Sequence, residues 1–140
     1  MAAIKIRYST QETGWAIVES SNYSIGNIPI FSENINIDDV VELGSEGEDG
    51  FKVIKDVKKI FYHSKTVFEY SEIPDFYQTQ KEFASFGCKV EGFFNPKCAD
   101  GKFIRGLAAI ASNMDKRDIE KILKKYGAKI VKHKKRKNIF

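Results

Sequence analysis

The chain has 140 residues, 42% of them hydrophobic and 30% charged, with a net charge of +4, a balance typical of a folded protein. Its longest apolar run, residues 107–111, is far shorter than the roughly 20 residues that cross a bilayer. The first residues lack the apolar run of a signal peptide, and two cysteines do not make a disulfide scaffold. We expect a cytoplasmic protein without a membrane segment or a cofactor.

The first 62 residues favour short β-strands, with alternating apolar and polar residues or many β-branched side chains. The predicted strands cover residues 4–8, 14–19, 23–28, 40–43, 51–55 and 57–62. An acidic, glycine-rich loop at residues 44–50 separates the fourth strand from the fifth. Short strands spaced about ten residues apart indicate a small antiparallel barrel or a strongly curled sheet.

The rest of the chain alternates strands with two helices. Strands are predicted at residues 65–70, 88–94, 103–111 and 128–132. One helix begins at Pro74 and is closed by Gly87, and the other is capped by Asn113 or Asp115 and ends at Gly127. The resulting order, β-α-β-β-α-β, is that of a ferredoxin-like unit. We predict an α+β fold: a β-rich part at residues 1–62 and a ferredoxin-like part with a basic tail at 63–140, either separate or integrated as one domain.

The net charge conceals two oppositely charged halves. No Lys or Arg lies between Tyr8 and Phe51, and residues 1–51 hold two basic residues against nine acids, a net charge of −7. The remainder holds 21 basic residues against ten acids, a net charge of +11. Such asymmetry indicates two surfaces with different partners or two halves that attract each other, unless both are simply solvated faces.

The acidic half offers one candidate binding surface. Seven acids and no base lie between residues 33 and 49. A surface of this kind can occupy the cationic cleft of another protein, as nuclease inhibitors do, because electrostatic attraction speeds the encounter. The candidate partner-binding residues are Glu33, Asp38, Asp39, Glu42, Glu46, Glu48 and Asp49.

The basic half offers a second candidate surface. A cationic run near the C-terminus could hold phosphates without sequence preference, although it could equally be a strand edge kept soluble by lysines. The strand at residues 102–110 has one aromatic residue where the RNA-binding signature expects several. The candidate nucleic-acid-binding residues are Lys132, Lys134, Lys135, Arg136 and Lys137.

No catalytic or metal-binding motif stands out. The two histidines, His63 and His133, do not make a metal cluster, and the two cysteines lie ten residues apart, outside any zinc or redox spacing. His63 precedes Ser64, but neighbouring residues of a strand point to opposite faces. We therefore predict no enzyme and no metal site, and an enzymatic or small-molecule role would depend on His63, Ser64 and Cys88.

Three segments carry a family resemblance: Asn27-Ile28-Pro29-Ile30-Phe31, Asp38-Asp39-Val40-Val41-Glu42 and His63-Ser64-Lys65-Thr66. They resemble an uncharacterised bacterial domain-of-unknown-function family with the pattern N-I-P-F-F, G-D-V-V and G-H-S-T. The chain departs from that pattern by an isoleucine, an aspartate, a tyrosine and a lysine at four positions. The resemblance implies one fold over nearly the whole chain and no established activity.

Small bacterial proteins of this composition often look like immunity proteins encoded beside secreted toxins, an argument by analogy. We therefore expect a non-enzymatic protein-binding protein, and specifically an immunity protein that neutralises a toxin, such as a nuclease of a contact-dependent inhibition system. It would cover the toxin's cationic site with its acidic surface. The alternative is a nucleic-acid-binding module that uses the basic C-terminal half.

Overall fold

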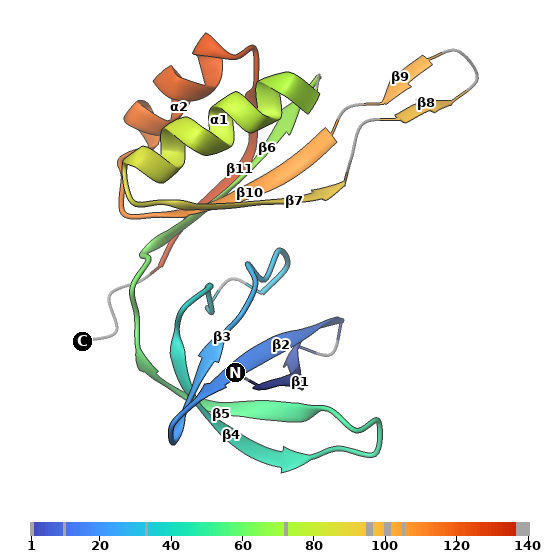
Figure 1. Cartoon of the computed structure of the whole chain (residues 1–140), viewed down its shortest axis with the longest axis vertical. Coiled ribbons are helices and arrows are strands. Elements are labelled where there is room, and N and C mark those ends of the chain that lie inside the picture. The colour runs from blue at the N-terminus through green and yellow to red at the C-terminus, as the bar shows by residue number, and fades with distance from the viewer. Residues whose placement is uncertain are drawn as a thin grey trace. The chain divides into compact units, whose positions relative to one another are not determined.

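The computed structural model describes residues 2–9, 11–32, 34–71, 73–94, 97–99, 102–104 and 106–136. The chain divides into two compact units, residues 1–62 and 63–140. The described residues of the first unit form strands and no helix, whereas the second unit combines strands with two helices (Figure 1). The fold is therefore mixed α+β and rich in strands.

The strands of the first unit form a curled, closed sheet. They are β1 (Ala2–Ser9), β2 (Glu12–Glu19), β3 (Asn22–Ile25), β4 (Val40–Glu46) and β5 (Lys52–Lys59). Each pairs antiparallel with the next, and β1 also pairs in parallel with β5, where Ile6 lies opposite Lys52. This last pairing closes the barrel.

Strand boundaries in the first unit differ from the predicted ones. Strand β3 ends at Ile25, before the predicted end at residue 28, although the Gly26 N–H still donates to the Trp15 carbonyl of β2 at 2.8 Å. Strand β4 continues into the predicted acidic loop, and its pairing with β5 contains register shifts that absorb the extra residues. The two strands predicted at residues 51–55 and 57–62 are the single strand β5.

The core of the first unit follows from alternation along its strands. Ile6, Ala16, Ile25 and Val41 are buried, one from each of the first four strands. Partly buried residues two positions away on the same strands, such as Ile4 and Tyr8 beside Ile6, pack against them. Since successive side chains of a strand point to opposite faces, this spacing directs one face of each strand to the interior.

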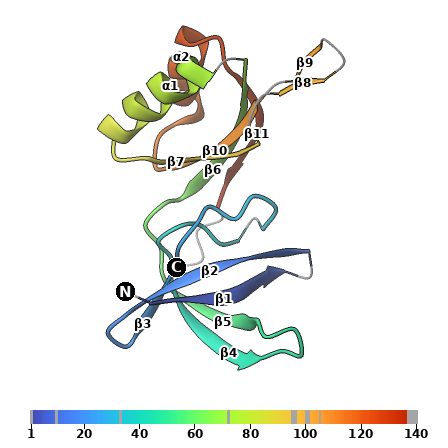
Figure 2. The same cartoon turned by 45° about the vertical axis from the view of Figure 1, so that its right-hand side comes forward.

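The second unit consists of a four-stranded sheet, a small hairpin and two helices. Its elements are β6 (Ser64–Tyr70), α1 (Ile73–Ser85), β7 (Lys89–Phe94), β8 (Lys97–Ala99), β9 (Lys102–Ile104), β10 (Gly106–Ser112), α2 (Lys116–Lys125) and β11 (Lys129–Lys135). The sheet has the order β11-β6-β10-β7, with all neighbours antiparallel. Both helices cover the same face of it (Figures 1 and 2).

The strand predicted at residues 103–111 is two strands. In the described part of the chain, strand β9 pairs with β8 in a separate two-stranded sheet, whereas β10 belongs to the main sheet. In Figure 2 the β8–β9 hairpin extends away from the four-stranded sheet.

The second helix is confirmed where its periodicity predicted it. Ile119, Ile122 and Leu123 are buried in a core with Phe68 and Phe83. The helix ends at Lys125 and is closed by Gly127, whose φ of +70° suits glycine, and the Ala128 N–H donates to the Leu123 carbonyl at 2.9 Å. This cap turns the chain directly into β11.

A second glycine is required by packing. Gly106 lies opposite Tyr70, and a Cβ atom at Gly106 would come within 2.3 Å of the Tyr70 ring. The ring is only 2% exposed and stacks on Phe76 at a centroid distance of 4.9 Å, so it has no room to move aside.

Substitution Gly106→Ala should therefore destabilise the protein by about 1–3 kcal/mol through overpacking. Thermal unfolding followed by circular dichroism should show a lower Tm than in the unmodified protein. Gly92→Ala is the matched control, because its Cβ would meet the Phe76 ring at 3.4 Å, an ordinary contact. Equal effects of the two substitutions would contradict the packing argument.

Candidate functional site

The acidic candidates at the start of β4 shape the chain locally. Asp39 is fully buried, and its carboxylate accepts the Asn36 N–H at 2.8 Å. Asp38 has a φ of +66°, and its N–H donates to the Ile25 carbonyl at 2.9 Å. Since a buried carboxylate does not reach a partner's surface, Asp39 serves the loop that leads into β4.

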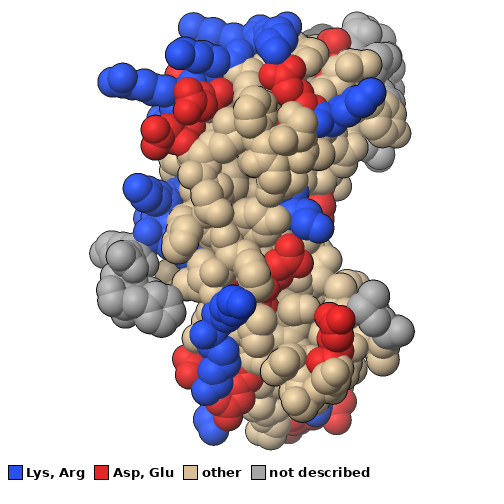
Figure 3. Space-filling view, turned by 60° about the vertical axis from the view of Figure 1, so that its left-hand side comes forward, with Lys and Arg blue, Asp and Glu red and all other residues tan. Residues whose placement is uncertain are grey.

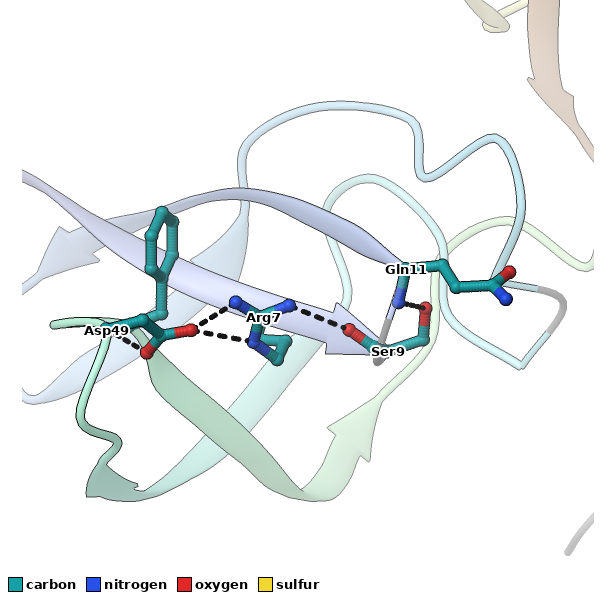
Figure 4. A network of polar contacts seen from close by, with 5 residues as sticks. Arg7, Ser9, Gln11 and Asp49 are labelled. Carbon is teal, nitrogen blue, oxygen red and sulfur yellow. Dashed lines mark hydrogen bonds and ion pairs between the residues drawn. The ribbon is translucent and has the colours of Figure 1, made fainter.

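Two further acidic candidates form ion pairs within the first unit. Glu42 lies 3.1 Å from the Lys58 Nζ and 3.5 Å from the Lys55 Nζ, and the hydrogen bond from Lys58 is the main cause that lowers the pKa of Glu42. Asp49 accepts hydrogen bonds from the Arg7 guanidinium (Figure 4), and these bonds lower the pKa of Asp49. Both carboxylates are therefore at least partly neutralised.

The acidic candidates do not form one uniform anionic surface. Glu46 and Glu48 are exposed in and beyond the end of β4, and Glu46 lies opposite Lys52 in the ladder. Glu33 lies outside the described residues. In the space-filling view, red acidic side chains of the first unit lie directly beside blue basic ones (Figure 3).

Glu12 is a structural residue that the sequence did not indicate. Its half-buried carboxylate accepts the N–H groups of Ile30, Phe31 and Ser32 at 2.6–3.1 Å, and the Ser32 hydroxyl at 2.8 Å. These partners are 18 to 20 residues further along the chain, so no local pattern reveals the contact. Glu12 fixes the loop that displays Phe31, whose side chain is 72% exposed.

The basic candidates lie on a strand at the end of a sheet. Lys132, Lys134 and Lys135 belong to β11, and Arg136 follows it; Lys137 lies outside the described residues. Strand β11 pairs with β6 on one side, and in the described part of the chain no strand pairs with its other side. The predicted basic tail is therefore mostly a sheet edge.

A groove runs between this edge and helix α2. Its main cavity has a volume of about 370 Å³. The floor is apolar, with Leu123, Ala128 and Ile130, and Val131 stands beside it with 56% exposure. The rim is charged, with lysines from both elements and one acid; its charged residues are Lys116, Glu120, Lys124, Lys129 and Lys132. We call these residues, together with His133, the β11–α2 groove.

A second cavity of about 270 Å³ adjoins the groove, and Lys116 and His133 line both. Its other lining residues include His63, Ser64 and Lys135, so the structure brings the two histidines to one cavity. The His133 Nδ1 lies 2.8 Å from the buried Thr66 hydroxyl. Burial is the main cause that lowers the pKa of His133, followed by the positive charge of Lys116.

The candidate catalytic residues do not form a reactive arrangement in this cavity. The Ser64 hydroxyl donates to the Ser112 carbonyl at 3.0 Å and lies equally close to the Ser112 hydroxyl, within the buried sheet. Cys88 packs against the Met114 sulfur, and burial raises the pKa of its thiol, which disfavours the nucleophilic thiolate. These contacts give Ser64 and Cys88 structural roles.

The described residues offer neither a metal-binding cluster nor a membrane-spanning helix. They contain no group of three or more His, Cys, Asp or Glu side chains that could hold a metal ion. Neither described helix is long and apolar enough to cross a membrane.

Removal of the Glu12 carboxylate should loosen the loop that it holds. Glu12→Ala should cost about 1–3 kcal/mol of stability, since the three N–H groups lose a charged acceptor. Hydrogen–deuterium exchange should be faster at Ile30, Phe31 and Ser32. Glu19→Ala, an exposed acid on the same strand, should change neither quantity, and an equal effect at Glu19 would contradict the assignment.

Removal of the Lys116 charge should raise the pKa of His133 towards its ordinary value. NMR titration of the ring C2 proton measures this, with His63→Gln used to assign the two signals. Lys121→Gln removes the same charge from a more distant position on α2 and should leave the His133 pKa unchanged.

In the unmodified protein the pKa of His133 is lowered by folding, so the folded state favours the neutral imidazole ring. Its contribution to stability is present above about pH 6.5 and is lost as the pH falls through the lower folded value.

Comparisons with known proteins bear on the fold. No family model matches the chain, and no curated protein matches it. Among solved structures, the chain is similar to a hypothetical protein from Neisseria gonorrhoeae, with a TM-score of 0.52 and 14% sequence identity. The match covers 96% of this chain and 94% of that chain. At this identity the likeness shows a shared fold alone.

Proposed function

We propose that this protein is a non-enzymatic protein-binding protein that docks its partner in the β11–α2 groove. The observation that carries the proposal is an apolar floor beside an exposed sheet edge, surrounded by lysines. Docking sites commonly combine a dry apolar centre with a polar rim, because the centre supplies affinity and the rim supplies orientation. The groove has both parts on one surface of the second unit.

The groove supports this proposal better than the acidic residues do. Of the acidic candidates, Asp39 is buried, and Glu42 and Asp49 are paired with bases of their own unit. The immunity-protein interpretation requires an anionic surface that meets a cationic cleft, and few of these carboxylates are available for it. A bacterial toxin domain therefore enters the proposal only as a class of partner that is suggested by analogy.

We also propose that the protein acts in the cytoplasm and that its second unit is ferredoxin-like. The element order β6-α1-β7-β10-α2-β11 and the sheet order β11-β6-β10-β7 support the second statement. In that arrangement the first and third strands are central, and the last strand lies at one edge. The groove is then a consequence of the fold, since α2 leads directly into that edge strand.

Site-specific cross-linking tests the docking surface. Val131 is replaced by benzoylphenylalanine in the full chain, which is expressed in its source organism and irradiated after nuclease treatment. We expect one predominant cross-linked protein. The matched control carries the same group at Tyr77 on α1, which is 61% exposed, compared with 56% at Val131. This control should not capture that protein.

Two outcomes would contradict the proposal. Cross-linking of the same proteins at both positions would show that the groove has no special role. Cross-linking at Val131 to nucleic acid alone, with binding that weakens steeply as salt is added, would favour the nucleic-acid-binding alternative.

A further inference from the structure

The docking mode follows from the backbone of β11. Its second edge carries N–H and C=O groups with no strand against them among the described residues. After a bulge at Val131, the four residues Lys132–Lys135 lie in regular register with β6, from Val67 to Ser64. A regular edge of this kind can accept another extended chain through main-chain hydrogen bonds.

The groove beside this edge selects side chains of such a chain. Every second side chain of an added strand would point to the face that carries the helices. On that face, the floor formed by Leu123, Ala128 and Ile130 would meet an apolar side chain. The added segment should therefore place an apolar residue over the floor.

The charges around the edge select the remaining residues. Lys124, Lys129 and Lys135 are exposed, and none of the ion pairs seen among the described residues involves them. The single acid of the groove, Glu120, lies 3.9 Å from Lys116. Carboxylates on an incoming strand would be attracted to these lysines, and a partner of the same charge would be repelled.

The same charges disfavour two other occupants. A second copy of this chain would bring an identical lysine-rich edge, and like charges that face each other across a strand pair destabilise it. A single-stranded nucleic acid normally needs aromatic side chains on which its bases stack. Among the described residues, no Phe, Tyr or Trp lines either cavity.

We infer that an extended acidic segment of a partner protein adds to β11 as a fifth strand of the sheet, with an apolar side chain over the groove floor. The inference rests on the proposed protein-binding function and specifies its partner. It assigns recognition to main-chain hydrogen bonds, and selectivity to Lys124, Lys129 and Lys135.

A peptide titration of the ¹⁵N-labelled full chain tests the inference. The probe is a capped octapeptide of alternating Glu and Val, and its counterpart alternates Lys and Val. We expect the acidic peptide to shift the amide signals of β11 and to slow exchange of its outward-facing amides at least tenfold. The Lys peptide should do neither. An acidic peptide with Pro at its two central positions should bind at least tenfold more weakly, since proline lacks the N–H donor.

Charge reversal provides the matched pair of variants. The double variant Lys129→Glu, Lys135→Glu should weaken binding of the acidic peptide at least tenfold. Lys81→Glu with Lys121→Glu changes the net charge equally at exposed positions that line neither cavity and should leave the affinity unchanged. Circular dichroism of both variants checks that they are folded.

Each remaining outcome would overturn the inference. These outcomes are equal binding of the two peptides, no protection at β11, protection that grows with protein concentration in the absence of peptide, or tighter binding of an octathymidine oligonucleotide. If cross-linking at Val131 still captured one protein, the docking surface would stand while strand addition and its acidic partner would fail. Loss of that cross-link would instead count against the proposed function itself.

Discussion

Strand edges are the constraint around which both units are built, because an unpaired backbone must be closed, covered or protected. The first unit closes its sheet: β1 turns back onto β5, and five short strands make a barrel. The second unit leaves its sheet open, with β7 and β11 at the two ends. In both units buried side chains follow from strand alternation, and in the described part of the second unit the outer edge of β11 can pair with another chain.

The charge distribution takes a different form once the chain is folded. The first unit holds six Lys and Arg against ten Asp and Glu, so its net charge is −4, and residues of β1 and β5 neutralise acids of the β4–β5 hairpin. The second unit holds 17 against nine, a net charge of +8. The excess lies partly along β11, where lysines discourage pairing between copies of the chain and favour an acidic partner.

How much could be predicted depended on the range of the interactions. Alternation at residues 4–8 and the helical spacing of Ile119, Ile122 and Leu123 depend on neighbours within one element, so the α+β class and these elements were predictable. The division of residues 102–112 into a hairpin strand and a sheet strand was not, because it depends on which chain lies alongside.

The candidate site shows the same limit. The lysines of β11 were visible in the sequence, whereas the groove was not, since Leu123 and Ile130 come together only when α2 packs beside the strand. In the sequence the acidic run suggested a single anionic surface. The two residues that neutralise parts of it, Lys58 and Arg7, lie outside the run, at the far end of β5 and on β1. Asp39 gave no sign that it would be buried.

The bulge at Val131 decides which side chains face the helices along the last strand. Ile130 lies opposite Phe68 and His133 opposite Thr66, so one extra residue separates two positions that share a face. If the same residues paired without the bulge, the parity of the strand would reverse: Lys132 would lie opposite Thr66 in place of His133, and the imidazole would move to the opposite face. The position of the histidine in the groove thus depends on a count of residues rather than on its own chemistry.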